Sequence, residues 1–143
     1  MTGNKIVIDA SVIAKWYNNE ALTDKALLVL QSFINGRIHL CAPEHLLYEV
    51  GNSIWKNKAL STADCMQAMN DLMEMDIEFT RLDPAMASKA MKLARDLSIS
   101  YYDALYIQLS IDRHMTLLSA DVKLISKARG NSNAMHLKDC QEQ

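Results

Sequence analysis

The 143-residue sequence is poor in the residues that build small metal or disulfide scaffolds. Its three cysteines, Cys41, Cys65 and Cys140, are an odd number with no C-x-x-C spacing, which excludes a disulfide framework and argues against a zinc site. The four histidines form no H-x-x-x-H pair. No apolar run reaches the length of a membrane span, and the first five residues do not resemble a signal peptide. We therefore expect a cytoplasmic protein without membrane contact.

An excess of charge of one sign is also lacking. The chain has 15 Lys and Arg against 17 Asp and Glu, a net charge of -2. This balance excludes a general basic surface, so any nucleic acid must be held by a local patch. There are no repeats, linkers or low-complexity segments, and the length suits one hydrophobic core. We expect one domain over residues 1–143, with 139–143 as a frayed tail.

Strand and helix patterns alternate along the whole chain. The β-branched run Ile6-Val7-Ile8 is typical of a strand buried on both faces. Periodicity and capping residues predict further strands over 38–42, 77–82, 116–119 and 134–137. They predict helices over 11–17, 23–34, 44–57, 61–75, 84–97, 100–114 and 122–129. Ser61 with Asp64 is the cap expected at the start of 61–75, and Asp83 before Pro84 is the cap expected at 84–97. Such alternation predicts an α/β fold, a parallel sheet with helices on both faces.

Four carboxylates stand at positions where such a fold binds ligands. Asp9 follows the first strand and Asp121 the fourth, so the two side chains emerge together if these strands are neighbours. Asp103 lies in the first turn of a helix. Glu49 shares one helix face with His45, Asn52 and Lys56.

Each carboxylate also has an ordinary structural explanation. Asp9 and Asp121 suit helix caps, and Asp103 suits a capping box with Ser100. Glu49 suits a solvated helix face. The spacing alone leaves both interpretations open.

Four stretches of sequence favour the functional interpretation of these acids. They are 6–12 around Asp9, 43–52 around Glu49, 102–106 around Asp103 and 118–124 around Asp121. In this order, each on the expected element, they resemble those of PIN-domain proteins, in particular VapC-type toxin ribonucleases of prokaryotic toxin–antitoxin pairs. The resemblance implies about five parallel strands in the order 3-2-1-4-5 and one acidic cluster that binds Mg²⁺ or Mn²⁺. It also implies a metal-dependent endoribonuclease that leaves 5′-phosphate ends, a small VapB-type antitoxin as partner, and a homodimer.

Hard divalent cations prefer carboxylate oxygens, and crowded carboxylates repel one another without a cation. We expect Asp9 and Asp121 to be the main metal ligands, Asp103 to complete the site, and Glu49 to bind directly or through water; one or two ions both fit. Ser11 and Asn52 are candidates to support these ligands, or are merely a first-turn hydroxyl and a surface amide.

For contacts with the RNA, the sequence offers candidate residues on weaker signals than those for the metal site. Four lysines lie within two turns of the acids and are candidates to meet phosphates, and Trp16 is a candidate to stack on an unpaired base. Equally, Trp16 suits the core and the lysines suit solvent. These lysines are Lys15, Lys56, Lys123 and Lys127.

Other functions remain as alternatives. The chain could be a solitary PIN nuclease in RNA processing, or a catalytically silent PIN scaffold, although a scaffold predicts lost acids and all four are present. A receiver-like signalling domain needs paired acids after an early strand and a Lys closing a late one, and Asp9 stands alone. A HAD-type phosphatase needs D-x-D, and residue 11 is Ser.

Overall fold

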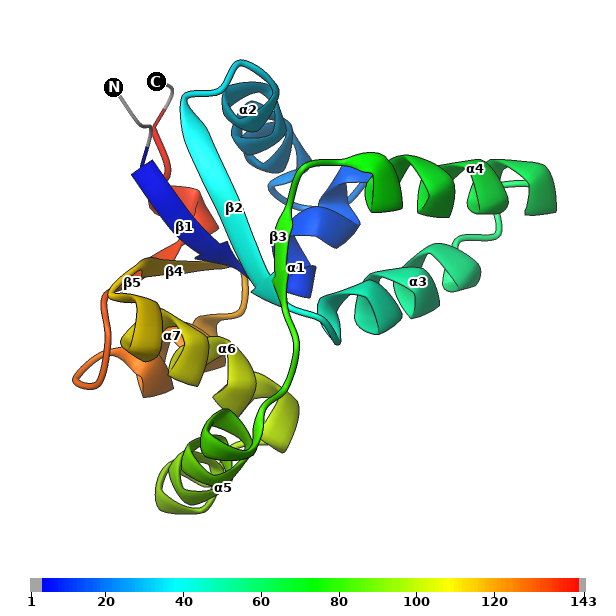
Figure 1. Cartoon of the computed structure of the whole chain (residues 1–143). Helices are drawn as coiled ribbons and strands as arrows, with labels where there is room; N and C mark the ends of the chain where they lie inside the picture. The colour runs from blue at the N-terminus through cyan, green and yellow to red at the C-terminus, as the bar shows by residue number, and fades with distance from the viewer. Residues whose placement is uncertain (1–3, 142–143) are drawn as a thin grey trace.

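The computed structural model describes residues 4–141, and these form a parallel sheet covered on both faces by helices (Figure 1). Within them the sheet has five strands in the order β3-β2-β1-β4-β5, and every neighbouring pair is parallel. This confirms the predicted fold class and strand order. The strands are β1 (Asn4–Ile8), β2 (Ile38–Pro43), β3 (Glu78–Thr80), β4 (Thr116–Ser119) and β5 (Ala134–His136).

Helices join consecutive strands. Residues between β1 and β2 form α1 (Ala10–Ile13), a 3-10 turn η1 (Ala14–Trp16) and α2 (Thr23–Ile34), and α2 packs on β2. The next connection contains α3 (Leu46–Lys56) and α4 (Thr62–Glu74), which extend together away from the sheet in Figure 1. It is followed by α5 (Pro84–Leu97) and α6 (Tyr101–Arg113). The last helix is α7 (Val122–Ala128), between β4 and β5.

The centre of the sheet is the core of the protein. Val7 and Ile8 of β1 and Leu117 and Leu118 of β4 are buried, as expected for strands covered on both faces. Helix α6 packs across β1, β2 and β4, with α5 outside it. Because α6 is fixed to the middle of the sheet, its first turn is held beside the strand ends.

Several predicted boundaries were wrong, for local reasons. The helix predicted over 44–57 begins at Leu46, because the Glu44 N–H still donates to the Thr80 carbonyl at 3.1 Å. The strand predicted over 77–82 shortens to Glu78–Thr80, an edge strand that pairs only with β2 in the described chain. The helix predicted over 11–17 tightens at residue 14 into η1.

The predicted caps are confirmed at α4 and α5. Ser61 and Asp64 form a reciprocal capping box at the start of α4, and Asp83 accepts a hydrogen bond from the Met86 N–H. Beyond β5, Leu137–Asp139 form a 3-10 turn, η2. Of the tail expected over 139–143, residues 142–143 lie outside the described residues. No helix within 4–141 is both long and apolar enough to cross a membrane.

Candidate active site

Asp9 lies at the carboxyl end of β1, where two hydroxyl groups fix its carboxylate. Ser11 Oγ donates to Oδ1 at 2.5 Å, and Ser119 Oγ, at the end of β4, donates to Oδ2 at 2.6 Å. The Asp9 residue is only 4% exposed. Burial raises the pKa of Asp9 to about 6 although both hydroxyls lower it, and the negative charge of Glu49 raises it further.

The same hydroxyls join the β1 and β4 ends. Each has a single proton, which it gives to Asp9, and its lone pairs accept backbone N–H groups: Ser11 from Ala120 and Ser119 from Asp121, both at 2.9 Å. Ser11 therefore makes the hydrogen bond to Asp9 on which its predicted supporting role depends. The Ser119 hydroxyl contacts both strand-end acids.

Asp9 and Asp121 also act as helix caps. Asp9 accepts the Ser11 N–H at 3.1 Å, and Asp121 Oδ1 accepts the N–H groups of Lys123 and Leu124 at 2.9 and 3.2 Å. Capping uses carboxylate lone pairs without moving the residues from the strand ends, and each oxygen has more than one lone pair. The two interpretations of these residues are thus compatible.

Asp103 occupies the third position of α6, where, within 4–141, only one of the two bonds of a capping box is present. Ser100 Oγ accepts the Asp103 N–H at 3.1 Å, but no return bond to the Ser100 N–H is present among the described residues. Asp64 does make that return bond to the Ser61 N–H, at 3.3 Å. Partial burial raises the pKa of Asp103, and the charges of Asp121 and Glu49 raise it further.

Glu49 projects from α3 toward the same acids. Tyr106 Oη donates to its Oε1 at 2.8 Å, and His45 Nε2 lies 3.1 Å from the same oxygen. Partial burial acts to raise the pKa of Glu49, but these contacts with His45 and Tyr106 prevail and lower it. Tyr106 is 1% exposed, so a buried hydroxyl of α6 fixes the carboxylate of α3.

The donor chemistry fits a hard divalent cation. Four carboxylates from α3, α6 and the ends of β1 and β4 lie within electrostatic reach, and repulsion among them contributes to the raised pKa values of Asp9 and Asp103. In the arrangement described for 4–141, no three His, Cys, Asp or Glu side chains are placed to hold a metal ion. We call Asp9, Glu49, Asp103 and Asp121 the acidic cluster.

Two of the predicted lysines line a pocket with two acids of the cluster. Asp103, Asp121, Lys123 and Lys127 face a pocket of about 540 Å³ between α6 and α7. Carboxylates and ammonium groups in one recess suit an anionic ligand bound with a cation. We call this recess the lysine pocket.

The remaining predicted contact residues lie elsewhere. Lys15 Nζ pairs with Glu20 at 3.1 Å. The Trp16 indole N–H donates to the Ala26 carbonyl at 2.8 Å and the ring packs against the core, as in the structural interpretation of this residue. Asn52 and Lys56 are exposed on α3, and Asn52 lies one turn beyond Glu49.

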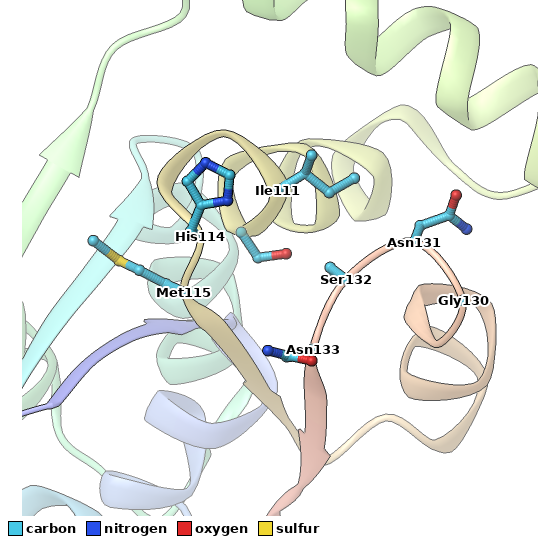
Figure 2. A pocket seen from close by; sticks show the side chains of 8 residues that line it. Ile111, His114, Met115, Gly130, Asn131, Ser132 and Asn133 are labelled. Carbon is cyan, nitrogen blue, oxygen red and sulfur yellow. The ribbon is translucent and has the colours of Figure 1, made fainter.

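A large polar pocket lies at the opposite end of α6. Its volume is about 560 Å³, and Figure 2 shows His114 at the end of α6 and Asn131, Ser132 and Asn133 on the loop before β5 around it. None of the predicted site residues lines it. Since α6 has 13 residues, the two ends are separated by close to the helix length of roughly 20 Å. Pocket size therefore does not identify the candidate site.

The sequence held signals for two further residues of the site. His45 precedes Glu49 by four positions, the spacing at which helix side chains meet. Tyr106 follows Asp103 by three positions on α6. Its contact with Glu49 spans 57 residues of sequence and could not be inferred from local spacing.

The Ser119 hydroxyl gives a first test of the site. We expect Ser119→Ala to lower the free energy of unfolding by about 2 kcal/mol at pH 7, because a buried carboxylate loses a donor and the Asp121 N–H loses an acceptor. The loss shrinks at pH 5, since Asp9 with its pKa of about 6 is then mostly protonated. Urea unfolding at both pH values measures it. Ser119→Thr keeps the hydroxyl and should restore stability; an equal loss at both pH values would contradict this role of the hydroxyl.

Comparisons with known proteins agree with the fold. A family model described as PIN domain matches residues 6–130. Exonuclease VapC9 of Pyrobaculum aerophilum is 26% identical over 84 residues, 59% of this chain and 63% of the relative, so the match spans less than two thirds of that protein.

Two solved structures are similar in fold at 15% identity. VapBC2 of Rickettsia felis, bound to a DNA fragment from its promoter, has a TM-score of 0.65 over 92% of this chain and 98% of that chain. VapC20 of Mycobacterium tuberculosis, described as a toxin that cleaves the sarcin–ricin loop, has a TM-score of 0.60 over 78% of this chain and 86% of that chain.

Proposed function

The chain belongs to the PIN domain family, and from this premise we propose that it is a divalent-metal-dependent endoribonuclease, the toxin of a toxin–antitoxin pair. The observation that carries the proposal is the acidic cluster, which gathers carboxylates from four parts of the chain beside the lysine pocket. The names of two relatives, an exonuclease and a toxin that cleaves the sarcin–ricin loop, support a nuclease that acts on RNA.

Each residue of the cluster has a role in this proposal. Asp9 and Asp121 are the main ligands of Mg²⁺ or Mn²⁺, with Asp103 completing the set and Glu49 binding directly or through water. The ion would supply positive charge that offsets the phosphodiester charge and would make water a better nucleophile near neutral pH. Ser11 and Ser119 hold the Asp9 carboxylate in one orientation. Lys123 and Lys127 bind neighbouring phosphates.

The proposed domain is the whole chain, 1–143. The family model ends at residue 130, but β5 beyond it completes the sheet and His136 Nε2 lies 3.0 Å from the Ala120 carbonyl, next to Asp121. The segment after residue 130 therefore supports the turn that carries one acid of the cluster.

The proposed partners follow from the relatives. The similarity to VapBC2, a structure that includes promoter DNA, supports a small VapB-type antitoxin that restrains this chain. We further propose a homodimer in the cytoplasm, as the family resemblance implies. A gene for a small antitoxin next to this one would support the toxin assignment over a solitary nuclease.

Cleavage of a mixed pool of single-stranded and structured RNA tests the proposal. We expect purified protein to cut RNA with Mg²⁺ or Mn²⁺, to leave 5′-phosphate ends, and to stop in EDTA. Asp121→Asn is the matched variant, because asparagine caps a helix as well as aspartate but is a poorer cation ligand. Cutting that persists in EDTA or in this variant would refute the mechanism. A folded protein that cuts nothing would favour the silent scaffold.

A further inference from the structure

A second, mostly apolar recess is lined by residues that adjoin two acids of the cluster in the sequence. Its volume is about 270 Å³, and it lies between the start of α3, the end of β3 and the first turn of α6. Its apolar walls include Leu82 and Met86. Three tyrosines and one histidine also line it, His45, Tyr48, Tyr101 and Tyr102, and Glu44 lies at the same recess. We call it the aromatic pocket.

The tyrosines present both fixed and accessible rings. Tyr101 Oη donates to the Ala87 carbonyl at 3.1 Å, which anchors that ring on α5. Tyr48 and Tyr102 are 72% and 59% exposed, so their rings are open to a ligand. Exposed aromatic faces beside a recess are the feature on which unpaired bases stack.

His45 connects the wall of this pocket to the acidic cluster. Its ring lies 5.3 Å from Tyr102 and 4.6 Å from Tyr106, centroid to centroid. Its Nε2 lies 3.1 Å from Glu49 Oε1, so the imidazole that lines the pocket also contacts an acid of the cluster.

The aromatic pocket lies next to the acidic cluster, because His45 lines the pocket and its Nε2 is 3.1 Å from Glu49 Oε1. Tyr48 and Glu49 are adjacent on α3, and Tyr102 and Asp103 are adjacent on α6. In each pair the tyrosine lines the aromatic pocket and the acid belongs to the cluster. A planar group in the pocket and a phosphodiester at the cluster are therefore close enough to belong to one nucleotide or to neighbouring ones.

We propose that the aromatic pocket binds one unpaired nucleobase of the RNA strand whose phosphodiester lies at the acidic cluster. The base stacks on Tyr48 and Tyr102 and lies against the apolar wall of the pocket. The backbone then continues to Lys123 and Lys127 in the lysine pocket. This inference rests on the proposed function and adds a specificity site to it: the enzyme reads one base and cuts beside it.

A nucleobase suits this pocket better than a protein side chain. An aliphatic side chain would fill the apolar volume, whereas the flat face of a base also matches the exposed rings of Tyr48 and Tyr102. The position beside carboxylates and lysines that suit a phosphate and its cation also favours a nucleotide.

Steady-state kinetics on a single-stranded RNA oligonucleotide test the pocket. Stacking on an aromatic ring is worth about 1–3 kcal/mol per base, so we expect Tyr48→Ala and Tyr102→Ala each to raise KM about 5- to 150-fold while kcat stays within about threefold. Their cleavage pattern on the RNA pool should lose base preference at one position. Tyr48→Phe keeps the ring and should match the wild type.

Trp55→Ala is the matched control, an aromatic residue of the same helix that is 74% exposed and lines no described pocket. It should leave KM unchanged. Unchanged KM and base preference in both alanine variants of the pocket would overturn the proposal, as would an equal rise in KM for Trp55→Ala. The unfolding temperature of each variant checks that it is folded.

A binding measurement separates this proposal from the nuclease assignment. Fluorescence anisotropy of a labelled single-stranded RNA, titrated with Asp103→Asn protein, needs no cleavage. We expect Tyr48→Ala in that background to weaken binding by the factor that raises KM. Binding that depends on Tyr48 without cleavage by the wild type would refute the nuclease and keep the pocket. Cleavage with binding independent of Tyr48 would do the reverse.

Discussion

Asp103→Asn is expected to reduce RNA cleavage by at least about 100-fold and to make the metal-free protein more stable at pH 7. Changes to groups that only support a metal ligand typically cost 10- to 100-fold, and Asp103 is proposed as a ligand itself. The gain in stability follows from the charge, since burial, Asp121 and Glu49 all raise the pKa of this carboxyl. An amide of the same shape removes that repulsion and keeps the Asp103 N–H bond to Ser100.

The fold offers a matched control in Asp64→Asn. Asp64 has the same position in α4 that Asp103 has in α6, after a serine cap, but it is bonded back to the Ser61 N–H. We expect Asp64→Asn to leave cleavage unchanged and to lower stability slightly, because the capping box weakens. Cleavage rates and melting temperatures in EDTA measure both effects. Comparable cleavage losses in the two variants, or near-normal cleavage by Asp103→Asn, would contradict the proposed role of Asp103.

The helices and strands could be predicted because their signals are local. Asp83-Pro84 and Ser61 with Asp64 define helix starts within four residues, and both are confirmed. The boundary error at Glu44 arose from a contact outside that window, the bond to the Thr80 carbonyl 36 positions away. Periodicity reports which face of an element is buried but not what the adjacent segment pairs with.

The candidate site was only partly accessible to sequence reasoning. That Asp9 and Asp121 lie together depends on β1 pairing with β4 across more than 100 residues. Only the family resemblance implied that order. Likewise, the sequence left open whether Trp16 stacks on an unpaired base or packs in the core. The hydrogen bond from its indole N–H to the Ala26 carbonyl favours the core. The aromatic pocket is built from three separate stretches, 43–48, 80–86 and 101–105, so no single stretch of sequence indicates it.

The second large effect is expected in the pH dependence of stability without metal. Asp9 has a pKa of about 6 in the folded protein against its usual 3.8, so between these values the folded state binds a proton that the unfolded state does not. This contribution to the free energy of unfolding therefore falls as pH rises through the window and is lost above pH 6. At 1.36 kcal/mol per pKa unit, the shift of the Asp9 pKa corresponds to roughly 3 kcal/mol of stability over the whole window. The shift is this large because Asp9 is only 4% exposed.

Comparing the wild type with Asp9→Asn separates the contribution of Asp9 to the pH dependence of stability from the contributions of the other acids. Urea unfolding in EDTA at pH 5 and pH 7 should show the stability of wild type relative to Asp9→Asn falling by about 1.3 kcal/mol between the two, because the Asp9 pKa of about 6 lies midway between these pH values. Asp83→Asn, a helix cap of α5, should show no such change.

Divalent cations should offset the loss of stability that accompanies ionisation of Asp9, because they favour the ionised carboxylates. With Mg²⁺ or Mn²⁺ at 100 times the dissociation constant, we expect the wild type to gain about 2.7 kcal/mol at pH 7. The gain should shrink at pH 5, where protons compete for Asp9, and should nearly vanish in Asp9→Asn. A gain of equal size in Asp9→Asn would place the cation elsewhere, and no gain at either pH would remove the metal from the proposed site. Because unfolding requires no RNA, this result bears on the acidic cluster whether or not the correct substrate has been found.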